Sequence, residues 1–181
     1  MPEWICLPRA LNLGSVNKVG MPQLRKALTA AGFDDVRTYV QSGNVVLNSR
    51  LRSADKVGTA VRAVLADEFG VDSAVVVRTP KQIRDIIAWN PFPEQAAAKP
   101  ATVQVIHLDA EPDPALVRAE LAKDWVPDEL AIRGLEACIS HSAGMHGSRL
   151  QHAPLLKRLG VSGTARNWRT LVAVAGMLTA R

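Results

Sequence analysis

Cysteine is scarce in this chain, and its scarcity excludes two kinds of stabilisation. The two cysteines, Cys6 and Cys138, lie in apolar runs in opposite halves of the sequence. They form no C-x-x-C spacing, and neither has an adjacent histidine that would complete a metal-binding set. Buried free thiols are therefore favoured over a disulfide, and no metal site is expected at the cysteines.

Long apolar runs and blocks of like charge are also missing. No uninterrupted apolar run approaches the ~20 residues that span a bilayer, and the N-terminus has no basic region followed by a long apolar stretch. We therefore expect a cytoplasmic protein without a membrane segment. The net charge of +5 and the pI near 9.6 permit binding to nucleic acid or to smaller anions, but no block of five or six like charges concentrates that charge.

The first part of the chain alternates between strand and helix patterns. A β-hairpin that turns at Ser42 and Gly43 is predicted by the alternating apolar residues Val36, Thr38 and Val40 before the turn and Val45 and Leu47 after it. Helical spacing precedes and follows this hairpin, at 24–31 and 57–65, and strands are expected at 3–7 and 73–77. The order strand, helix, strand, strand, helix, strand is that of a split βαβ, or ferredoxin-like, lobe.

The second part repeats the order strand, helix, strand, strand, helix after a connecting segment. Thr79, Pro80 and Gln82 form a capping-box start for a helix, which ends before the proline-interrupted linker "WNPFPEQAAAKP". A strand at 102–108, a helix opened by Asp113 and a hairpin at 129–141 come next along the chain. We therefore predict an α+β fold of two ferredoxin-like lobes in one compact chain, with antiparallel sheets and helices packed on one face. The expected domains are 1–79, a linking segment 80–100, and 101–181.

The C-terminal segment "TARNWRTLVAVAGML" predicts an amphipathic helix. Its apolar stripe comprises Trp168, Leu171, Val172, Ala175 and Leu178. Thr164, Arg166 and Asn167 would then fall in the first turn, where backbone N–H groups lack intrahelical partners and the helix dipole is positive. Such a helix start can hold an anion.

The loop "NLGSVNK" is longer than a simple connector requires, because most connections take two to six residues. It is not a Walker A element, since Lys18 is followed by Val19 rather than by Ser or Thr. Glycine N–H groups, Lys18, the amides of Asn12 and Asn17 and the following helix start favour anion binding. The alternative is a loop whose asparagines satisfy their own backbone through Asx-turns.

Two further polar motifs allow structural and functional interpretations. In "QSGN", a tight hairpin explains Ser42 and Gly43, and Asn44 tolerates positive φ; alternatively, Gln41 and Asn44 face the same cleft as the opening loop. The motif "HSAGMHGSRLQH" contains three histidines, but their spacing and the lack of a carboxylate argue against a metal site. Ser148 and Arg149 in its glycine-rich loop fit anion contact better.

Four motifs together, "NLGSVNKVGMPQLRKAL", "TYVQSGN", "NPFPE" and "TARNWRTL", resemble the uncharacterised bacterial domain-of-unknown-function family numbered sixteen ninety-seven. The resemblance implies an α+β protein with ferredoxin-like halves and implies no settled activity. Pro8, Ala10 and Ser15 depart from the family pattern. Arg9, Asn12, Asn17, Lys18 and Arg25 stand where the pattern has them.

Three classes of function remain open. We favour a protein that binds a phosphate-bearing or other anionic small ligand, with no cofactor implied and no catalytic constellation visible. A nucleic-acid-binding module and a structural or protein-interaction protein are the alternatives; aromatic residues, at 4% of the chain, are too few for a base-stacking sheet. The candidate ligand-binding residues are Arg9, Asn12, Asn17, Lys18, Arg25, Gln41, Asn44, Ser148, Arg149, Arg166 and Asn167.

Overall fold

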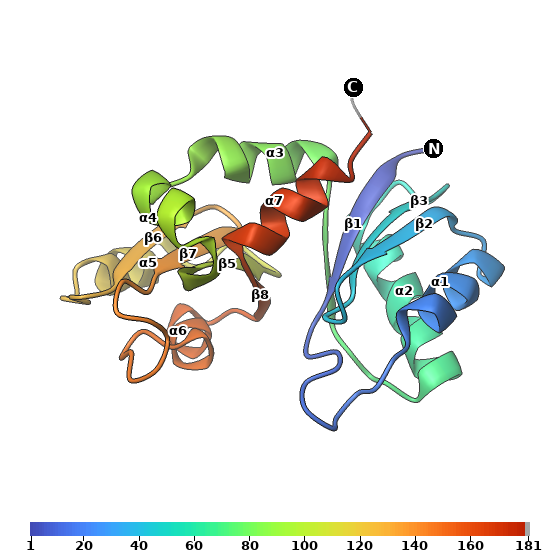
Figure 1. Cartoon of the computed structure of the whole chain (residues 1–181), viewed down its shortest axis with the longest axis horizontal. Coiled ribbons are helices and arrows are strands. Elements are labelled where there is room, and N and C mark those ends of the chain that lie inside the picture. Colours follow the sequence, from blue (N-terminus) through green and yellow to red (C-terminus); the bar gives the residue numbers. More distant parts are fainter. Residues whose placement is uncertain (180–181) are drawn as a thin grey trace. The chain divides into compact units, whose positions relative to one another are not determined.

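The computed structural model describes residues 1–179 and contains two compact lobes, each built on a four-stranded antiparallel sheet (Figure 1). Of the described residues, the first lobe comprises Met1–Asp85 and 173–179, and the second comprises Ile86–Val172. The chain passes from one lobe to the other within helix α3 (Pro80–Trp89) and again within helix α7 (Trp168–Gly176). The expected α+β class with antiparallel sheets is confirmed, and the expected domain limits stay a prediction.

The first lobe has the strand order β2-β3-β1-β4, with β1 and β3 at its centre. Its elements are β1 (Glu3–Pro8), α1 (Met21–Ala30), β2 (Asp34–Tyr39), β3 (Asn44–Asn48), α2 (Ala54–Phe69) and β4 (Val75–Arg78). Figure 1 shows α1 and α2 on one face of this sheet. The core between them contains Trp4 and Cys6 of β1, Leu24 of α1 and Val61 of α2, all buried.

The second lobe repeats this strand order as β6-β7-β5-β8. Its elements are α4 (Pro93–Ala98), a short 3-10 turn (Pro100–Thr102), β5 (Val103–Leu108), α5 (Pro114–Leu121), β6 (Glu129–Arg133), β7 (Glu136–Ser140), α6 (His152–Leu159) and β8 (Gly163–Asn167). Ile106 and Leu108 of β5 pack with Leu155 and Leu159 of α6 in a buried cluster. One face of the β5-centred sheet is thus closed by α6 and, through Val117, by α5.

The capping-box start at residue 79 is confirmed, but the segment expected to be an irregular linker is partly helical. Thr79 N–H donates to Gln82 Oε1, and Gln82 N–H donates to Thr79 Oγ1, as a capping box requires. Within "NPFPEQAAAKP", residues 93–98 form α4. A proline in the first turn and a run of alanines both favour a helix, and these local preferences outweigh the surrounding prolines.

The prediction that Thr164, Arg166 and Asn167 occupy the first turn of the last helix is wrong. Residues 163–167 form β8, which pairs with β5 and places Thr164 opposite His107. Helix α7 begins only at Trp168, and Asn167 accepts a hydrogen bond from Thr170 N–H. Pairing with the central strand β5 gives hydrogen-bond partners to the backbone N–H and C=O groups of residues 163–167. In the first turn of a helix, the backbone N–H groups of these residues would have no such partners.

The apolar face of α7 is also shifted from the expected stripe. Trp168 and Leu171 are buried, as expected, but Val174 is buried and Val172 is 47% exposed. The helix begins at Trp168, and the spacing i, i+3 and i+6 places Trp168, Leu171 and Val174 on one face of it.

We expect Trp168→Ala to lower the free energy of unfolding by about 3 to 5 kcal/mol, because it empties a large buried site. The matched control is Val172→Ala in the same helix, for which a change below about 1 kcal/mol is expected at an exposed position. Urea denaturation of the full chain measures both. Equal effects of the two substitutions would contradict the placement of Trp168 in the core.

A buried carboxylate joins α5 to the last turn of α6. Glu120, 3% exposed, accepts hydrogen bonds from Lys123 and from Arg158 Nε, the latter at 2.9 Å. Both cations also lie over the Trp125 ring, at 5.8 and 5.4 Å from its centroid. Burial by itself raises the pKa of Glu120, but the hydrogen bonds from Arg158 and Lys123 outweigh burial, and the net shift of this pKa is downward.

We expect Glu120→Gln to cost about 1 to 2 kcal/mol of unfolding free energy at neutral pH, since both cations are partly solvated. Because the pKa of Glu120 is lower in the folded than in the unfolded chain, this contribution is present above pH 4.5 and is lost as pH falls through the lowered value. Denaturation curves at several pH values test it. Asp85→Asn, which breaks the exposed Lys81–Asp85 pair, is the control and should change stability by less than about 0.5 kcal/mol.

Candidate functional site

The loop between β1 and α1 contains an unusual concentration of left-handed backbone. Ala10, Asn12 and Asn17 have φ of 56°, 54° and 52°. Asparagine adopts this region more readily than other residues with a side chain, whereas alanine is strained there. The loop therefore holds a conformation that its backbone would not choose locally, and contacts elsewhere must stabilise it.

The side-chain amide of Asn12 supplies those contacts. Asn12 Oδ1 accepts from Val19 N–H at 2.8 Å, and Asn12 Nδ2 donates to Val19 O at 2.9 Å and to Gln41 O at 2.7 Å. Asn17 Nδ2 donates to Ala10 O at 3.1 Å. These amides tie the loop to itself and to the β2–β3 hairpin, so they shape the loop rather than projecting freely from it.

The hairpin turn meets the loop through a close contact as well. Gly43 has φ of 75°, and a Cβ at this position would lie 2.7 Å from Leu11 Cδ1. Glycine is therefore required at 43 both for the turn and for the approach of the buried Leu11. Asn44, which tolerates positive φ, does not use that tolerance here; the non-glycine residue with positive φ in this turn is Val40, at 51°.

An open depression of about 540 Å³ lies where the loop, the hairpin and the start of α1 meet; it is lined by Asn12, Lys18, Val19, Gly20 and Gln41. Lys18 is exposed and makes no salt bridge within residues 1–179. Gly20, the residue before α1, offers no side-chain cap, and the first turn contains no acidic residue. The depression is therefore bordered by positive charge from Lys18 and from the helix dipole.

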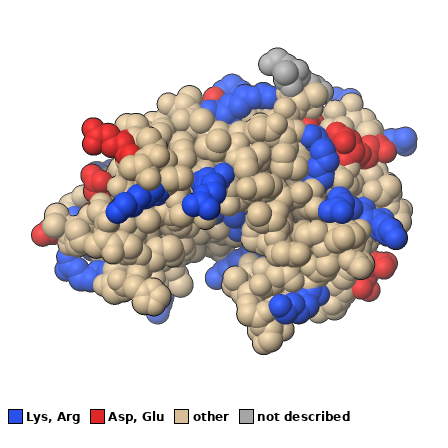
Figure 2. All heavy atoms as spheres, in the orientation of Figure 1, with Lys and Arg blue, Asp and Glu red and all other residues tan. Residues whose placement is uncertain are grey.

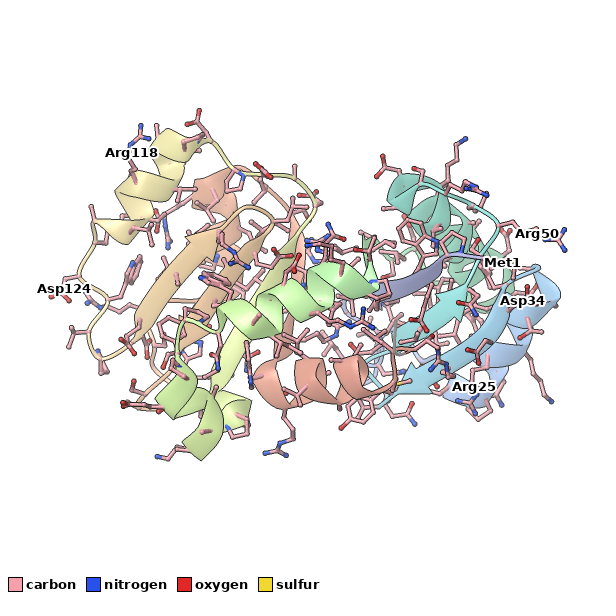
Figure 3. The ribbon with its side chains drawn as sticks, turned by 90° about the horizontal axis from the view of Figure 1, so that it is seen from above. Met1, Arg25, Asp34, Arg50, Arg118 and Asp124 are labelled. Carbon is pink, nitrogen blue, oxygen red and sulfur yellow. The ribbon has the colours of Figure 1, made fainter. Side chains whose placement is uncertain are left out.

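The other candidate residues of the first lobe lie apart from this depression. Arg9 is exposed, and its backbone pairs with Ala74 beside β4. Arg25 donates from Nη1 to Thr38 Oγ1 at 2.6 Å and so links α1 to β2 (Figure 3). Asn44 is fully buried and donates to Tyr39 O and Ser42 Oγ. Of the candidates, Asn12, Lys18 and Gln41 are the three that line the depression.

The four candidates at the end of the sequence belong to the second lobe and are engaged within it. Ser148 Oγ donates to Asp128 Oδ2, and Arg149 Nη2 donates to Asp124 O at 2.9 Å, in the loop after α5 (Figure 3). Arg166 is buried on β8 and donates to Thr164 Oγ1; burial lowers its pKa to about 10, so it stays charged at neutral pH. Asn167 caps α7.

A buried polar cluster in the second lobe was not expected from the sequence. Asp128 and His141 are 6% and 1% exposed, with Asp128 Oδ2 3.4 Å from His141 Nδ1. The ring of His152 lies 6.3 Å from that of His141 between centroids. The contact follows from the hairpin register, which no local sequence pattern specifies: β6 pairs Glu129 with Ser140, so the next antiparallel position places Asp128 opposite His141.

The part of the chain that the structure describes shows neither a cluster of metal-binding side chains nor a reactive cysteine. Residues 1–179 contain no group of three or more His, Cys, Asp or Glu side chains placed to hold a metal ion. Cys6 and Cys138 are buried free thiols, as expected. Burial raises the pKa of both, that of Cys138 to about 12, with Glu136 also raising it, so neither is a thiolate at neutral pH.

The family model for proteins of unknown function called DUF1697 matches residues 1–137. The chain belongs to the DUF1697 family. The resemblance noted from the sequence motifs is thereby confirmed, although "TARNWRTL" lies beyond the matched residues. No curated protein matches this DUF1697 chain.

The fold of this chain is similar to that of a solved structure. The conserved bacterial protein SP0830 from Streptococcus pneumoniae is similar to this DUF1697 chain with a TM-score of 0.74 and 21% sequence identity, over 98% of this chain and 99% of that one. At this identity the likeness concerns the fold alone.

Within the described residues no helix has the length and apolar character needed to cross a membrane.

We expect Asn12→Ala to lower the unfolding free energy by about 2 to 3 kcal/mol, because it removes three hydrogen bonds and leaves alanine at positive φ. Ser15→Ala, at an exposed position of the same loop, should change it by less than about 0.5 kcal/mol. Urea denaturation monitored by circular dichroism compares the two. If Asn12→Ala behaves like the control, its amide does not hold the loop.

Proposed function

We propose that this DUF1697 protein binds a phosphate-bearing or other anionic small ligand in the depression formed by the loop after β1, the β2–β3 turn and the start of α1. The observation that carries the proposal is Lys18, an exposed cation without a salt-bridge partner within residues 1–179, beside a helix start that has no side-chain cap. Gln41, whose carbonyl is held by Asn12, adds a polar side chain at the rim.

The local charge supports an anion rather than a neutral ligand. Met21 and Gln23 place backbone N–H groups in the first turn of α1, where no intrahelical acceptor is available. Pro22, between them, has no N–H to leave unsatisfied and is suited to a helix start. An anion at this position would meet both these donors and the charge of Lys18.

The rigidity of the loop supports a preformed site. Hydrogen bonds from Asn12 and Asn17 fix the loop before any ligand arrives, and the close contact of Gly43 with Leu11 fixes the hairpin turn beside it. A site that is already ordered loses less conformational entropy when it binds. In this proposal the two asparagines act as positioning residues, and Lys18 and Gln41 contact the ligand.

Nucleic-acid binding is the weaker alternative. Figure 2 shows Lys and Arg side chains scattered over the visible face among acidic ones rather than gathered into one stripe. Among residues 1–179, the depression is lined by no aromatic residue on which a base could stack. We further propose that the protein acts in the cytoplasm, where phosphorylated metabolites are plentiful ligands for a site of this kind.

We expect at least one member of a panel of inorganic phosphate, sugar phosphates and nucleotides to raise the melting temperature of the wild-type protein, since a ligand that binds only the folded state stabilises it. Lys18→Glu should abolish this rise, because it replaces the cation by an anion at the rim. Lys26→Glu, an equal change of charge at an exposed position of α1, should retain it. Differential scanning fluorimetry at about 50 and 200 mM salt measures all three proteins.

The outcomes of this experiment distinguish anion binding in the depression from nucleic-acid binding. No rise with any compound would contradict the binding of these anions, and an equal rise in Lys18→Glu would place the site elsewhere. Tight binding of random-sequence nucleic acid that weakens by orders of magnitude across this salt range would instead favour the nucleic-acid module, because many phosphate contacts release many counterions.

A further inference from the structure

Asp128, His141, Ser148 and His152 form a polar cluster where the segment 142–151 is attached, and its imidazoles can respond to acid. Asp128 and His141 are buried, and Ser148 and His152 are half-buried. Asp128 precedes β6, His141 follows β7, and His152 is the first residue of α6. Leu150, within the segment, is fully buried in the apolar core. The cluster thus joins three elements at the place where the segment is attached.

The cluster contains two imidazoles and one carboxylate. Asp128 Oδ2 lies 3.4 Å from His141 Nδ1, so a proton on His141 is balanced by a neighbouring negative charge. His152 has no such carboxylate; its charged neighbour is His141 itself. The neighbouring cations Arg149 and Arg158 face other partners, the Asp124 carbonyl and Glu120. Among the described residues, Asp128 is the carboxylate that lies against His141.

The imidazole nitrogens are poorly placed to carry charge. Nε2 of His141 and Nε2 of His152 are buried and have no hydrogen-bond partner within residues 1–179. A protonated imidazole has two N–H donors, and a buried donor without an acceptor is costly. His152 also begins a helix, where the positive end of the dipole disfavours a cation.

The same cluster holds the segment in place. Ser148 Oγ donates to Asp128 Oδ2 and accepts from Leu150 N–H at 2.9 Å. Gln151 Nε2, beside His152, donates to Ser148 O at 2.8 Å. A displacement of His152 would therefore disturb the attachment of Ser148 directly, and the exposed residues Met145 and His146 would move with it.

We propose that Asp128, His141, Ser148 and His152 form an acid-sensitive switch that releases the segment 142–151 when His152 becomes protonated. At neutral pH the His152 imidazole is uncharged, because its pKa is lowered, and the segment is closed. As pH falls, a proton on His152 places a cation beside the His141 ring, where the buried Nε2 of His152 has no hydrogen-bond partner among the described residues. When the segment opens, the His152 cation becomes exposed to water.

The sign of the pH dependence follows from His152. Burial lowers the pKa of His152 from its ordinary 6.5, and the charge on His141 lowers this pKa further. Above pH 6.5 the closed and open states bind the same number of protons, so opening does not depend on pH. Below pH 6.5 the open state binds the proton more strongly, and opening increases until the pH reaches the lowered pKa of the closed state.

Hydrogen exchange of the full chain at about pH 7.5 and about pH 5.0 tests the switch, with rates divided by the intrinsic exchange rate at each pH. In wild type we expect exchange in 142–151 to rise at the lower pH, up to about tenfold for each unit by which the His152 pKa is lowered. His152→Gln should abolish this rise, since glutamine cannot be protonated. His146→Gln, at an exposed position of the same segment, should leave it unchanged.

A second measurement keeps the test decisive if a variant is unstable. An NMR titration of the wild-type imidazoles, with resonances assigned from the His146→Gln and His152→Gln spectra, should show His152 titrating below its ordinary pKa. A wild-type segment whose corrected exchange is the same at both pH values, an acid response that survives in His152→Gln, or a His152 that titrates at 6.5 or above would each overturn the proposal.

Discussion

The burial of both faces of the two central strands is the constraint on which each lobe depends. Every residue of β1 and every residue of β5 is buried. A strand in this position pairs with a neighbour on either side, so its backbone is satisfied and its side chains must be apolar or have internal partners. Within the first lobe, Glu3 meets this requirement by accepting hydrogen bonds from Arg37 and from Thr179.

The candidate sites lie at strand ends because the strand interiors leave no room for a ligand. The loop that shapes the depression leaves the end of β1, and the Asp128–His141 contact lies one residue beyond the last pair of β6 and β7. At these positions the sheet stops supplying hydrogen-bond partners to the backbone. Side chains such as those of Asn12 and Ser148 supply them instead, and they fix the geometry of the loops that leave the sheet.

Polar residues in a loop can therefore hold the loop or contact a ligand, and here the two roles fall to different residues. The amides of Asn12 and Asn17 bond to backbone groups, whereas Lys18 has no salt-bridge partner in residues 1–179. A single loop motif thus contains both a scaffold and an exposed cation. The second lobe combines roles differently, because Ser148 both accepts from its own loop and donates to the buried Asp128.

Local signals in the sequence are enough to specify several elements of this protein. The order of strands and helices in the first lobe, the capping box at Thr79, the cap at Asp113 and the burial of Trp168 and both cysteines follow from periodicity, caps and composition. Other features depend on partners distant in the chain, so they emerge only when the lobes fold. Residues 163–167 form a strand because β5 is there to pair with them, and Asn12 is a structural residue because Gln41 and Val19 are within its reach. Asp128 acquires its role from His141, across a hairpin whose register no local pattern specifies.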